Sequence, residues 1–232
     1  MRVNRVLVPE LGADEVVLRG PEAHHLRDVL RLKAGALVEA FDGNGNVAAG
    51  SVAAADQGGV VLTLGQPQPS EAEAQLDVTV AVALLKGDKL ADVVRQCTEL
   101  GVMRFVLLVT RHADVTDMSH AKLLRLQRVA EEATRQSGRA RVPQVAPPTP
   151  LAALSWSGAA LVADPRATGT LTGAATAGRL TLVTGPEGGL ATSEVEALVA
   201  RGARAVTLGP RILRAETAPL ALAALALLGG GQ

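Results

Sequence analysis

The stretch LVTGPEGGL, residues 182–190, joins a short apolar strand to a turn that contains three glycines, a proline and a glutamate. Gly-rich turns that follow strands commonly bind phosphates through their backbone N–H groups. This turn, however, lacks the Gly-Lys-Ser/Thr of a P-loop and does not match the dinucleotide-binding pattern GxGxxG. Because the carboxylate of Glu187 would repel a pyrophosphate, the turn favours a ligand with a positive charge or hydrogen-bond donors. Taken alone, it is equally compatible with a strand–helix turn whose glutamate is solvated.

Other strand-like apolar runs occupy residues 76–85, 105–109, 159–164, 180–184 and 205–208. They are nearly continuous and do not alternate, which is typical of strands buried on both faces of a parallel sheet. Helical periodicity fills most of the gaps, most clearly in an apolar set that Gly101 is placed to terminate: Leu90, Val93, Val94, Cys97 and Leu100. A further helix is expected to open with a capping box of Ser193 and Glu196. Residues 74–232 are therefore expected to form an α/β domain with a mostly parallel sheet.

The first 68 residues follow a different pattern, with short strand-like pieces at Arg5–Val8, Ala36–Phe41, Val47–Ala53 and Val60–Leu64. Asp-Gly and Asn-Gly within residues 42–45 are strong signals for a hairpin between two of these pieces. One helix is expected to open at Pro21 and to bury Leu26, Val29 and Leu30. The segment GQPQPS, residues 65–70, is expected to be a linker. Residues 1–68 therefore predict a small β-barrel-like module with one helix.

The composition excludes several classes of protein. Only two Phe, one Trp and no Tyr occur among 232 residues, which argues against binding nucleic acid by stacking bases on aromatic side chains. Lys and Arg equal Asp and Glu at 23 each, so any basic surface must be local. Cys97 is the only cysteine, and four histidines do not favour a zinc site, so no metal is expected. The N-terminus lacks the apolar core of a signal peptide, and the apolar run 218–228 is about half the length of a membrane span, so we expect a soluble, cytoplasmic protein.

Two further stretches bear on function besides the turn at residues 185–189: a second loop that follows a strand, and a basic segment. LGPRILRAETAP, residues 208–219, again follows a strand and opens the last helix. Ligands of open α/β sheets bind outside the carboxyl ends of the strands, so two such loops at neighbouring strands could enclose one pocket. The segment 122–141 carries six basic residues against two acidic ones. It is either a solvated helix face or a patch that contacts phosphates.

Five stretches occur in an order that resembles one family: HHLRDVLRLKAG (24–35), LLKGDKLADVVRQCTELGV (84–102), EEATRQSGRARVP (131–143), LVTGPEGGL and LGPRILRAETA. They are similar to the RsmE family, the 16S rRNA (uracil-N3)-methyltransferases of the SPOUT superfamily. The resemblance covers almost the whole chain. It implies a PUA-like RNA-binding β-barrel over residues 1–68 and a SPOUT methyltransferase domain over 74–232, with a mostly parallel sheet and a C-terminal trefoil knot. It further implies S-adenosylmethionine (SAM) as cofactor, 16S rRNA of the small ribosomal subunit as substrate, and a homodimer.

The resemblance also implies site residues, position by position. The SAM site would comprise Gly185, Glu187, Gly188, Leu208, Gly209, Ile212 and Leu213. Arg2, Arg5, Arg27 and Arg31 of the small domain would contact RNA phosphates. From the basic segment, Arg135, Arg139 and Arg141 are also expected to contact RNA. SAM carries a sulfonium charge and no phosphate, so Glu187 could oppose that charge or accept hydrogen bonds from the cofactor. Pro219 departs from the family pattern, but it falls in the first turn of the last helix, where proline is tolerated.

The expected product is N3-methyluridine at a specific uridine of the decoding region. N3 of uracil carries an imide proton, so a base, or a cation that stabilises the imidate, must stand near it. The candidates are Arg139, Arg214 and Glu216, with Glu132 next, and the sequence does not choose among them. Glu99 is either a paired structural carboxylate or a substrate contact. Two other functions remain open: a noncatalytic RNA-binding protein, and a SPOUT enzyme that acts on another RNA or another atom.

Overall fold

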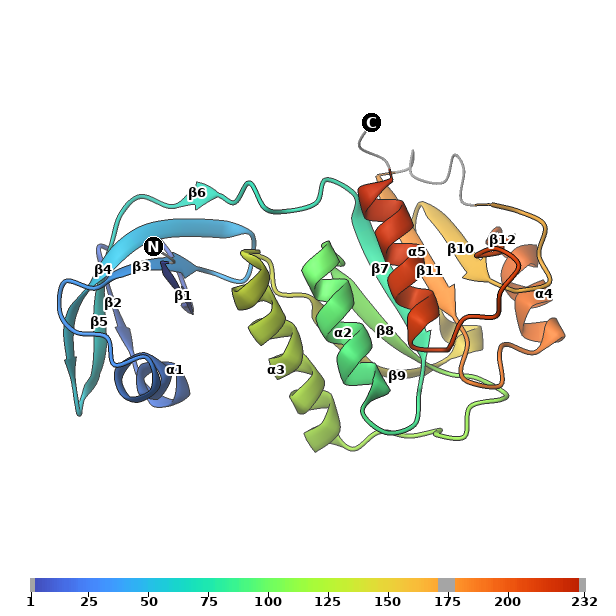
Figure 1. Ribbon diagram of the computed structural model, residues 1–232, viewed down its shortest axis with the longest axis horizontal. Coiled ribbons are helices and arrows are strands. Elements are labelled where there is room, and N and C mark those ends of the chain that lie inside the picture. Colours follow the sequence, from blue (N-terminus) through green and yellow to red (C-terminus); the bar gives the residue numbers. More distant parts are fainter. Residues whose placement is uncertain (1–2, 171–177, 230–232) are drawn as a thin grey trace. The chain divides into compact units, whose positions relative to one another are not determined.

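The computed structural model describes residues 3–170 and 178–229, and its chain divides into two compact units. The first unit contains residues 1–73 and 134–142, and the second contains residues 74–133 and 143–232. Arg2, one of the expected RNA contacts, lies outside the described residues. The short return segment 134–142 belongs to the first unit, which no pattern in the sequence indicated (Figure 1).

The first unit is built on a six-stranded sheet of order β1-β3-β4-β5-β2, in which β6 pairs with β4. All neighbours are antiparallel except β1 and β3. The strands are β1 (Asn4–Leu7), β2 (Glu15–Leu18), β3 (Leu37–Phe41), β4 (Asn46–Asp56), β5 (Gly59–Leu64) and β6 (Gln68–Pro69). The expected hairpin between β3 and β4 is confirmed, and Oδ1 of Asp42 accepts hydrogen bonds from the backbone N–H groups of Asn44 and Asn46. The edge strand β2 was not predicted.

The helix of the first unit departs from the expected apolar face. α1 (Gly20–His24) continues into a π-helical turn, His25–Val29, in which the N–H of Leu30 donates to the carbonyl of His25. The wider turn rotates the following residues away from the core. Leu26 is therefore buried as predicted, whereas Val29 and Leu30 are exposed.

The return segment is anchored by an arginine inside the first unit. Arg139 is only 2% exposed, and its Nη2 donates to Oε2 of Glu73 at 2.8 Å. The other oxygen of Glu73 accepts from the backbone N–H groups of Ala140 and Arg141 at 2.7 and 2.8 Å. Nη1 of Arg5 donates to the carbonyl oxygen of Arg139 at 2.6 Å. Glu73 and Arg5 therefore hold both sides of the segment.

Part of the expected linker is paired with the first sheet. The N–H of Gly65 donates to the carbonyl of Ala49, and the N–H of Ser70 donates to the carbonyl of Gly45. Between them β6 runs antiparallel to β4. Proline is compatible with this position because an edge strand leaves some N–H groups unused.

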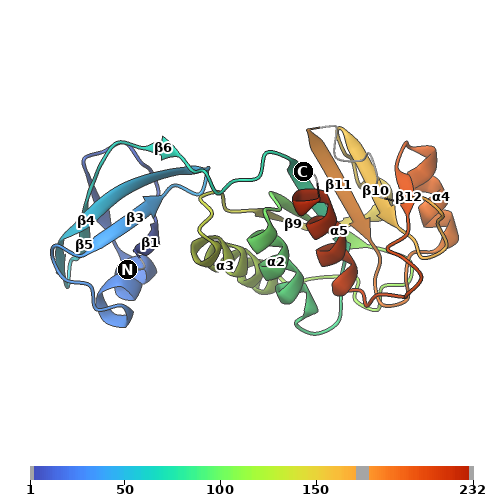
Figure 2. The same ribbon diagram turned by 45° about the horizontal axis from the view of Figure 1, so that its top comes forward.

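The second unit is built on a fully parallel six-stranded sheet of order β12-β10-β11-β7-β8-β9. Its strands are β7 (Asp77–Ala83), β8 (Arg104–Val109), β9 (Gln144–Pro150), β10 (Ala159–Ala163), β11 (Arg179–Thr184) and β12 (Arg204–Val206). Helices α2 (Lys89–Leu100) and α5 (Thr217–Leu228) pack on one face, and α4 (Thr192–Ala200) covers the other (Figures 1 and 2). Val80 and Val82 of the central strand enter the first core, and Ala81 enters the second. The expected α/β domain with a parallel sheet is therefore confirmed.

The ends of individual helices can be compared with the ends that the sequence predicted. Gly101 ends α2 in the left-handed conformation, with φ of +114°, and Pro219 lies in the first turn of α5, both as predicted. The predicted capping box of Ser193 and Glu196 is wrong. Instead α4 opens after Ala191, and the carboxylate of Glu194 accepts from the N–H of Ala191 at 2.8 Å.

The structure also bears on the expected basic segment. α3 (His120–Ser137) carries the basic segment and ends within the return segment of the first unit. No helix of the described residues has the length and apolar character needed to cross a membrane.

The trefoil knot stays a prediction, since the connection between β10 and β11 is described only in part.

Arg139→Met should destabilise the first unit. It leaves the half-buried carboxylate of Glu73 without its cation, and breaking a buried ion pair costs about 3–5 kcal/mol. Urea unfolding followed by circular dichroism, with amide exchange at Ala140 and Arg141, measures the loss. Arg179→Met, which breaks an exposed pair with Asp77, is the control and should cost less than about 1 kcal/mol.

The same pair should give a pH signature. Burial alone would raise the pKa of Glu73, but hydrogen bonds and the charge of Arg139 outweigh it and lower that pKa below 4.5. Stability from the pair is thus present above pH 4.5 and is lost as the pH falls through the lowered pKa. Arg139→Met should flatten this acid-dependent loss. An unchanged unfolding free energy and pH dependence in the variant would contradict a structural role for Arg139.

Candidate functional site

A pocket of about 700 Å³ lies in the second unit, outside the carboxyl ends of β10, β11 and β12. Each of these parallel strands ends in a connection that lines the pocket: residues 163–166 after β10, 185–192 after β11 and 206–209 with 211–216 after β12. The volume is within the range of about 300–1,000 Å³ that is typical of small-molecule sites. Parallel pairing explains the convergence, because it brings the carboxyl ends of neighbouring strands to one edge of the sheet.

The pocket brings together most of the expected site residues. All seven expected cofactor residues line it: Gly185, Glu187, Gly188, Leu208, Gly209, Ile212 and Leu213. Two expected catalytic residues, Arg214 and Glu216, line it as well. The third, Arg139, does not, because it belongs to the first unit and is buried against Glu73. The burial and ion pair of Arg139 indicate a structural role and do not support its expected catalytic and RNA-binding roles.

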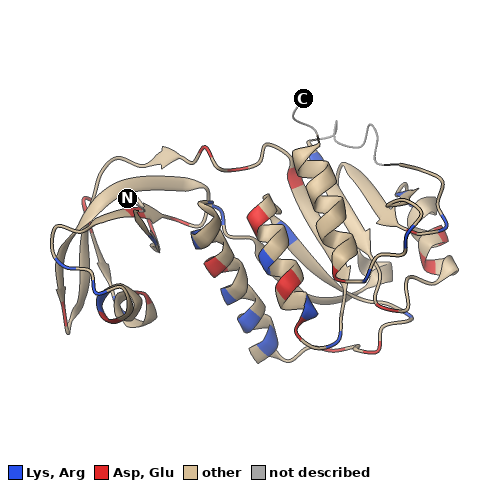
Figure 3. Cartoon of the chain, in the orientation of Figure 1, with Lys and Arg blue, Asp and Glu red and all other residues tan. Residues whose placement is uncertain are grey.

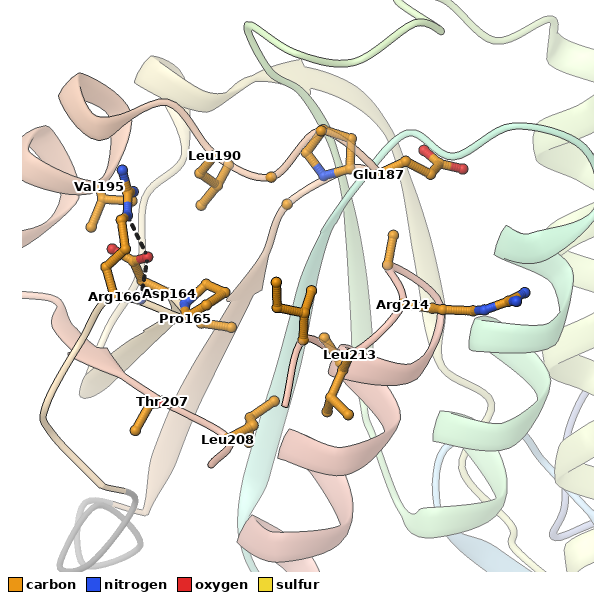
Figure 4. Close-up of a pocket in the computed structure, with 18 of the residues that line it drawn as sticks. Asp164, Pro165, Arg166, Glu187, Leu190, Val195, Thr207, Leu208, Leu213 and Arg214 are labelled. Carbon is orange, nitrogen blue, oxygen red and sulfur yellow. Dashed lines mark hydrogen bonds and ion pairs between the residues drawn. The ribbon is translucent and has the colours of Figure 1, made fainter. Parts of the chain in front are cut away.

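Polar groups stand on opposite sides of an aliphatic interior. Figure 4 shows the side chains of Leu190, Leu208 and Leu213 between the Asp164–Arg166 pair on one side and Glu187 with Arg214 on the other. An apolar body flanked by a few fixed polar groups is the usual composition of a site for an organic ligand of mixed polarity.

The first Gly-rich loop is held by contacts within the protein. A Cβ on Gly185 would lie 2.8 Å from the backbone nitrogen of Leu190, and a Cβ on Gly188 would lie 3.1 Å from Cβ of His112. The absent side chains therefore make room for the loop itself and for a neighbouring loop. Bulk at Gly188 would first displace His112, so a ligand is not what requires glycine there.

The second loop needs glycine for its backbone conformation. Gly209 has φ of +95°, and a Cβ there would meet only the end of the Arg211 side chain, at 3.8 Å. L-residues rarely adopt this φ, so any side chain at this position would strain the loop. Ile212 and Arg214 follow with exposures of 86% and 84%. Such exposure is unusual for an isoleucine that lines a pocket.

Lys89, at the start of α2, joins the two loops and was missed by the sequence analysis. Its Nζ lies 2.8 Å from Oε1 of Glu187 in the first loop and 3.4 Å from Oε2 of Glu216 in the second. The hydrogen bond to Glu187 raises the pKa of Lys89. Burial alone would raise the pKa of Glu187, but the Lys89 hydrogen bond and backbone donors outweigh it and lower that pKa. The motif KGDK between β7 and α2 was the available signal, because it places two lysines at a strand end.

Asp164, which follows β10, is a second missed residue. Its Oδ1 accepts from the backbone N–H and the Nε of Arg166, at 3.0 and 2.9 Å, and Nη1 of Arg166 donates to Oγ1 of Thr192 at 2.6 Å. Burial opposes ionisation of Asp164, but the bonds to Arg166 outweigh it and lower its pKa. Asp164 is therefore a charged carboxylate in the pocket wall at neutral pH.

Most of the arginines expected to contact RNA have partners inside the first unit. Arg5 pairs with Glu39, Arg135 with Glu22 at 2.8 Å, and Nη2 of Arg141 donates to the carbonyl of Asn44 at 3.2 Å. Arg27 pairs with Asp28 and donates to the carbonyl of Asp56. Arg31 is exposed and has φ of +53°. The contacts of the paired arginines limit how far they can reach toward a phosphate.

The exposed basic residues lie elsewhere on the expected basic segment. Lys122, Arg125 and Arg128 are spaced three residues apart along α3 and are exposed (Figure 3). Arg125 also pairs with Asp88 at 2.6 Å. The sequence identified the segment correctly as basic, but it could not separate its exposed amino-terminal part from its paired carboxyl-terminal part.

The remaining singled-out residues lie away from the pocket lining. Glu99 is exposed and lies 3.6 Å from Arg95 on α2, and Glu132 is exposed on α3. Cys97 is fully buried, as predicted, and burial raises the pKa of its thiol to about 12. Nδ1 of His24 lies 2.6 Å from Oδ2 of Asp28. The described residues contain no group of histidine, cysteine and acidic side chains that could hold a metal ion.

Comparisons with known proteins agree with this architecture. An RNA methyltransferase domain family matches residues 72–227, and an RNA methyltransferase PUA domain family matches residues 18–64. The ribosomal RNA small subunit methyltransferase E of Synechocystis is 35% identical, over 94% of this chain and 75% of its own length. The enzyme of the same name from Mycobacterium bovis is also 35% identical, over 95% and 89%.

Solved structures extend the agreement to the fold. Ribosomal RNA small subunit methyltransferase E from Neisseria gonorrhoeae, bound to S-adenosyl methionine, has a TM-score of 0.89 and 27% identity, with 96% of each chain covered. A probable rRNA-methyltransferase from Porphyromonas gingivalis has a TM-score of 0.84 and 26% identity, over 98% of this chain and all of its own. With an N-terminal PUA-type unit, a SPOUT-type parallel sheet and 35% identity to curated relatives, the chain belongs to the RNA methyltransferase family of ribosomal RNA small subunit methyltransferase E.

Proposed function

We propose that the chain transfers a methyl group from SAM to N3 of a specific uridine in the decoding region of 16S rRNA. The observation that carries this proposal is a pocket lined by three strand-end loops, with charged carboxylates on both sides of an aliphatic interior. An enzyme that modifies ribosomal subunits acts in the cytoplasm, where those subunits are assembled.

The residues of the pocket fit SAM. Its adenine matches the aliphatic interior of Leu190, Leu208 and Leu213. Its hydroxyl and amino groups and its sulfonium charge match the carboxylates of Asp164 and Glu187. The Neisseria relative, whose structure contains S-adenosyl methionine, resembles this chain over 96% of its length and supports the same ligand here.

Bound SAM would supply an electrophilic methyl group on a sulfonium. The chain's own task is to bind the uridine and accept the proton of N3. Glu216 is the best-placed acceptor, because its carboxylate lines the pocket between the cations of Lys89 and Arg214, at 3.4 and 3.9 Å. These cations would also stabilise the negative charge that develops on the uracil oxygens.

The alternatives fit the pocket less well. A noncatalytic RNA-binding protein would have no use for a pocket enclosed by two Gly-rich loops. Methylation at C5 of uracil usually requires a thiol for covalent attack, and the only cysteine, Cys97, is buried with a raised pKa. A SPOUT enzyme that modifies another RNA or atom would use the same cofactor pocket. The relatives' names, which specify small-subunit ribosomal RNA, favour the rRNA substrate.

We also propose a homodimer whose interface includes α5. Leu222, Ala223 and Ala226 are buried within the chain, whereas Leu225 and Leu228 on the same helix are 54% and 67% exposed. An apolar helix with exposed leucines on a second side has more apolar surface than its own sheet covers. A second copy of the helix would cover it.

Two glycines of nearly equal φ give a matched test of the SAM site. Gly209, in the pocket, has φ of +95°, and Gly202, at the end of α4, has φ of +97°, and neither has close neighbours. Either Gly→Ala change should cost about 1–2 kcal/mol of stability, because of the same backbone strain. Only Gly209→Ala should weaken SAM binding, by at least about tenfold in calorimetry. Equal effects of the two changes on SAM affinity would contradict the site.

The methylated atom can be read by primer extension. Small subunits that lack the modification are incubated with the protein and labelled SAM. Because N3 lies on the pairing edge of uracil, its methylation should stop reverse transcriptase at one uridine, and modified subunits, as the control, should take up no label. Label incorporation with read-through at every uridine would retain SAM as donor and refute N3 as the target.

The dimer predicts a specific response to charge on α5. Leu225→Glu together with Leu228→Glu should raise the dimer dissociation constant by at least about tenfold in analytical ultracentrifugation, since two carboxylates would be buried in an apolar interface. Leu124→Glu, at a 44% exposed leucine of α3, is the control and should leave the mass unchanged. A wild-type protein that sediments as a monomer at micromolar concentration would refute the dimer.

A further inference from the structure

We infer that Lys89 is a positioning residue, which places one ammonium between the carboxylates of the two pocket loops and thereby fixes Glu216 for the proton of N3. The inference rests on the proposed function. It assigns to the first residue of α2 a role that neither Gly-rich loop can fulfil by itself.

The geometry that supports it joins three parts of the chain that are distant in sequence. Lys89 is the first residue of α2, Glu187 lies in the loop after β11, and Glu216 stands directly before α5. Only the ammonium of Lys89 has an ion-pair distance to both carboxylates among the described residues, at 2.8 and 3.4 Å. Because α2 and α5 pack against each other in one core, Lys89 and Glu216 stand on rigid elements.

The two oxygens of Glu216 have different surroundings. Oε2 is buried and accepts no hydrogen bond from the described residues, and the cation beside it is Lys89. Oε1 lies 3.9 Å from Nη1 of Arg214, whose side chain is 84% exposed and is therefore weakly held. A buried carboxylate oxygen needs a compensating charge. Lys89 supplies that charge to Oε2 and leaves Oε1 for the substrate.

The charged groups around the carboxylates of Glu187 and Glu216 determine what removal of the Lys89 ammonium would change. The groups facing the two carboxylates are Lys89 on α2, Lys86 in the β7–α2 connection, and Arg214 in the second loop. Lys86 differs from Lys89, because its own ammonium pairs with Asp114 at 2.8 Å and its hydrogen bond to Glu187 comes from the backbone N–H, at 3.4 Å. Without Lys89 no ammonium would lie between the two carboxylates, and Glu187 would lose the hydrogen bond that lowers its pKa.

Three variants separate positioning from general structure. Lys89→Met removes the charge and keeps the length of the side chain. Lys89→Arg keeps the charge. Lys86→Met is the matched control, since it breaks an exposed pair of the same length in the β7–α2 connection and Lys86 does not line the pocket. Single-turnover methylation of small subunits at saturating SAM is measured from acid to neutral pH, together with SAM affinity by calorimetry.

Lys89→Met should lower the single-turnover rate by about a hundredfold or more, the size of effect expected for a misplaced proton acceptor. It should also move the acidic limb of the rate profile upward, because the ammonium that stabilises the charged carboxylates of the pocket is gone. Lys89→Arg should restore most of the rate and the position of the limb. Lys86→Met should change neither.

A measurement without substrate completes the test. Carbon-13 NMR of labelled glutamate carboxyls follows the titration of Glu187, identified by the resonance missing in Glu187→Gln. Lys89→Met should raise the pKa of Glu187, because burial then acts without the opposing hydrogen bond, and Lys86→Met should leave the pair intact.

The inference is overturned if Lys89→Met leaves the acidic limb and the Glu187 titration where they are in the wild type, or if it lowers only SAM affinity. Failure of the proposed function gives a different result, in which the wild-type protein itself forms no N3-methyluridine. That result also removes the role assigned to Lys89 in this reaction.

Discussion

Parallel pairing of β11 with β7 on one side and with β10 on the other is the constraint on which the site depends. Six consecutive residues of β11 are in register with β7, and β10 carries β12 on its far edge. The four strands therefore end at one edge of the sheet, and the chain segments that follow them must meet there. The pocket, the two Gly-rich loops and Lys89 are consequences of this register, because each follows the carboxyl end of one of these strands.

The chemistry of the pocket comes from which side chains those strand ends carry. Asp164 follows β10, Glu187 follows β11 and Glu216 follows the loop after β12, while Lys89 enters from the start of α2, after β7. Glu187 pairs with Lys89, whose ammonium also lies 3.4 Å from Glu216 of the second loop, and this link between the two loops accounts for a glutamate in a glycine-rich turn. The described residues that line this pocket all belong to the second unit. The first unit's arginines Arg5, Arg135 and Arg139 mainly hold the return segment and that unit together.

Much of the fold could be predicted from the sequence, because buried strands and glycine-terminated helices leave strong local signals. The apolar runs located β7, β8, β10, β11 and β12, and Gly101 marked the end of α2. β9 was missed, because its residues 144–150 contain three prolines, which are tolerated only because β9 is an edge strand. The capping box was assigned to Ser193 and Glu196, although Glu194 performs the reciprocal half of it from the third helical position.

The sequence likewise predicted some residues of the candidate site and missed others. Loop motifs identified the pocket residues that lie close together in sequence, including Gly185, Glu187 and Gly209. Lys89 was missed, because its partner Glu187 is 98 residues away and no local pattern encodes that contact. Asp164 was missed although its partner Arg166 is two residues away, because its place in the pocket wall depends on the fold. Arg139 was a candidate for catalysis from the chemistry of N3 and for RNA binding from the basic segment, whereas its burial beside Glu73 is a tertiary property.

The most direct test of the account is a titration of the wild-type protein with SAM, followed by NMR of leucine methyl groups. Leu190, Leu208 and Leu213 line the pocket, whereas Leu18, Leu26 and Leu62 form the core of the first unit. The account predicts saturable binding with shifts in the first set and none in the second. Absence of binding, or shifts confined to the first unit, would contradict it.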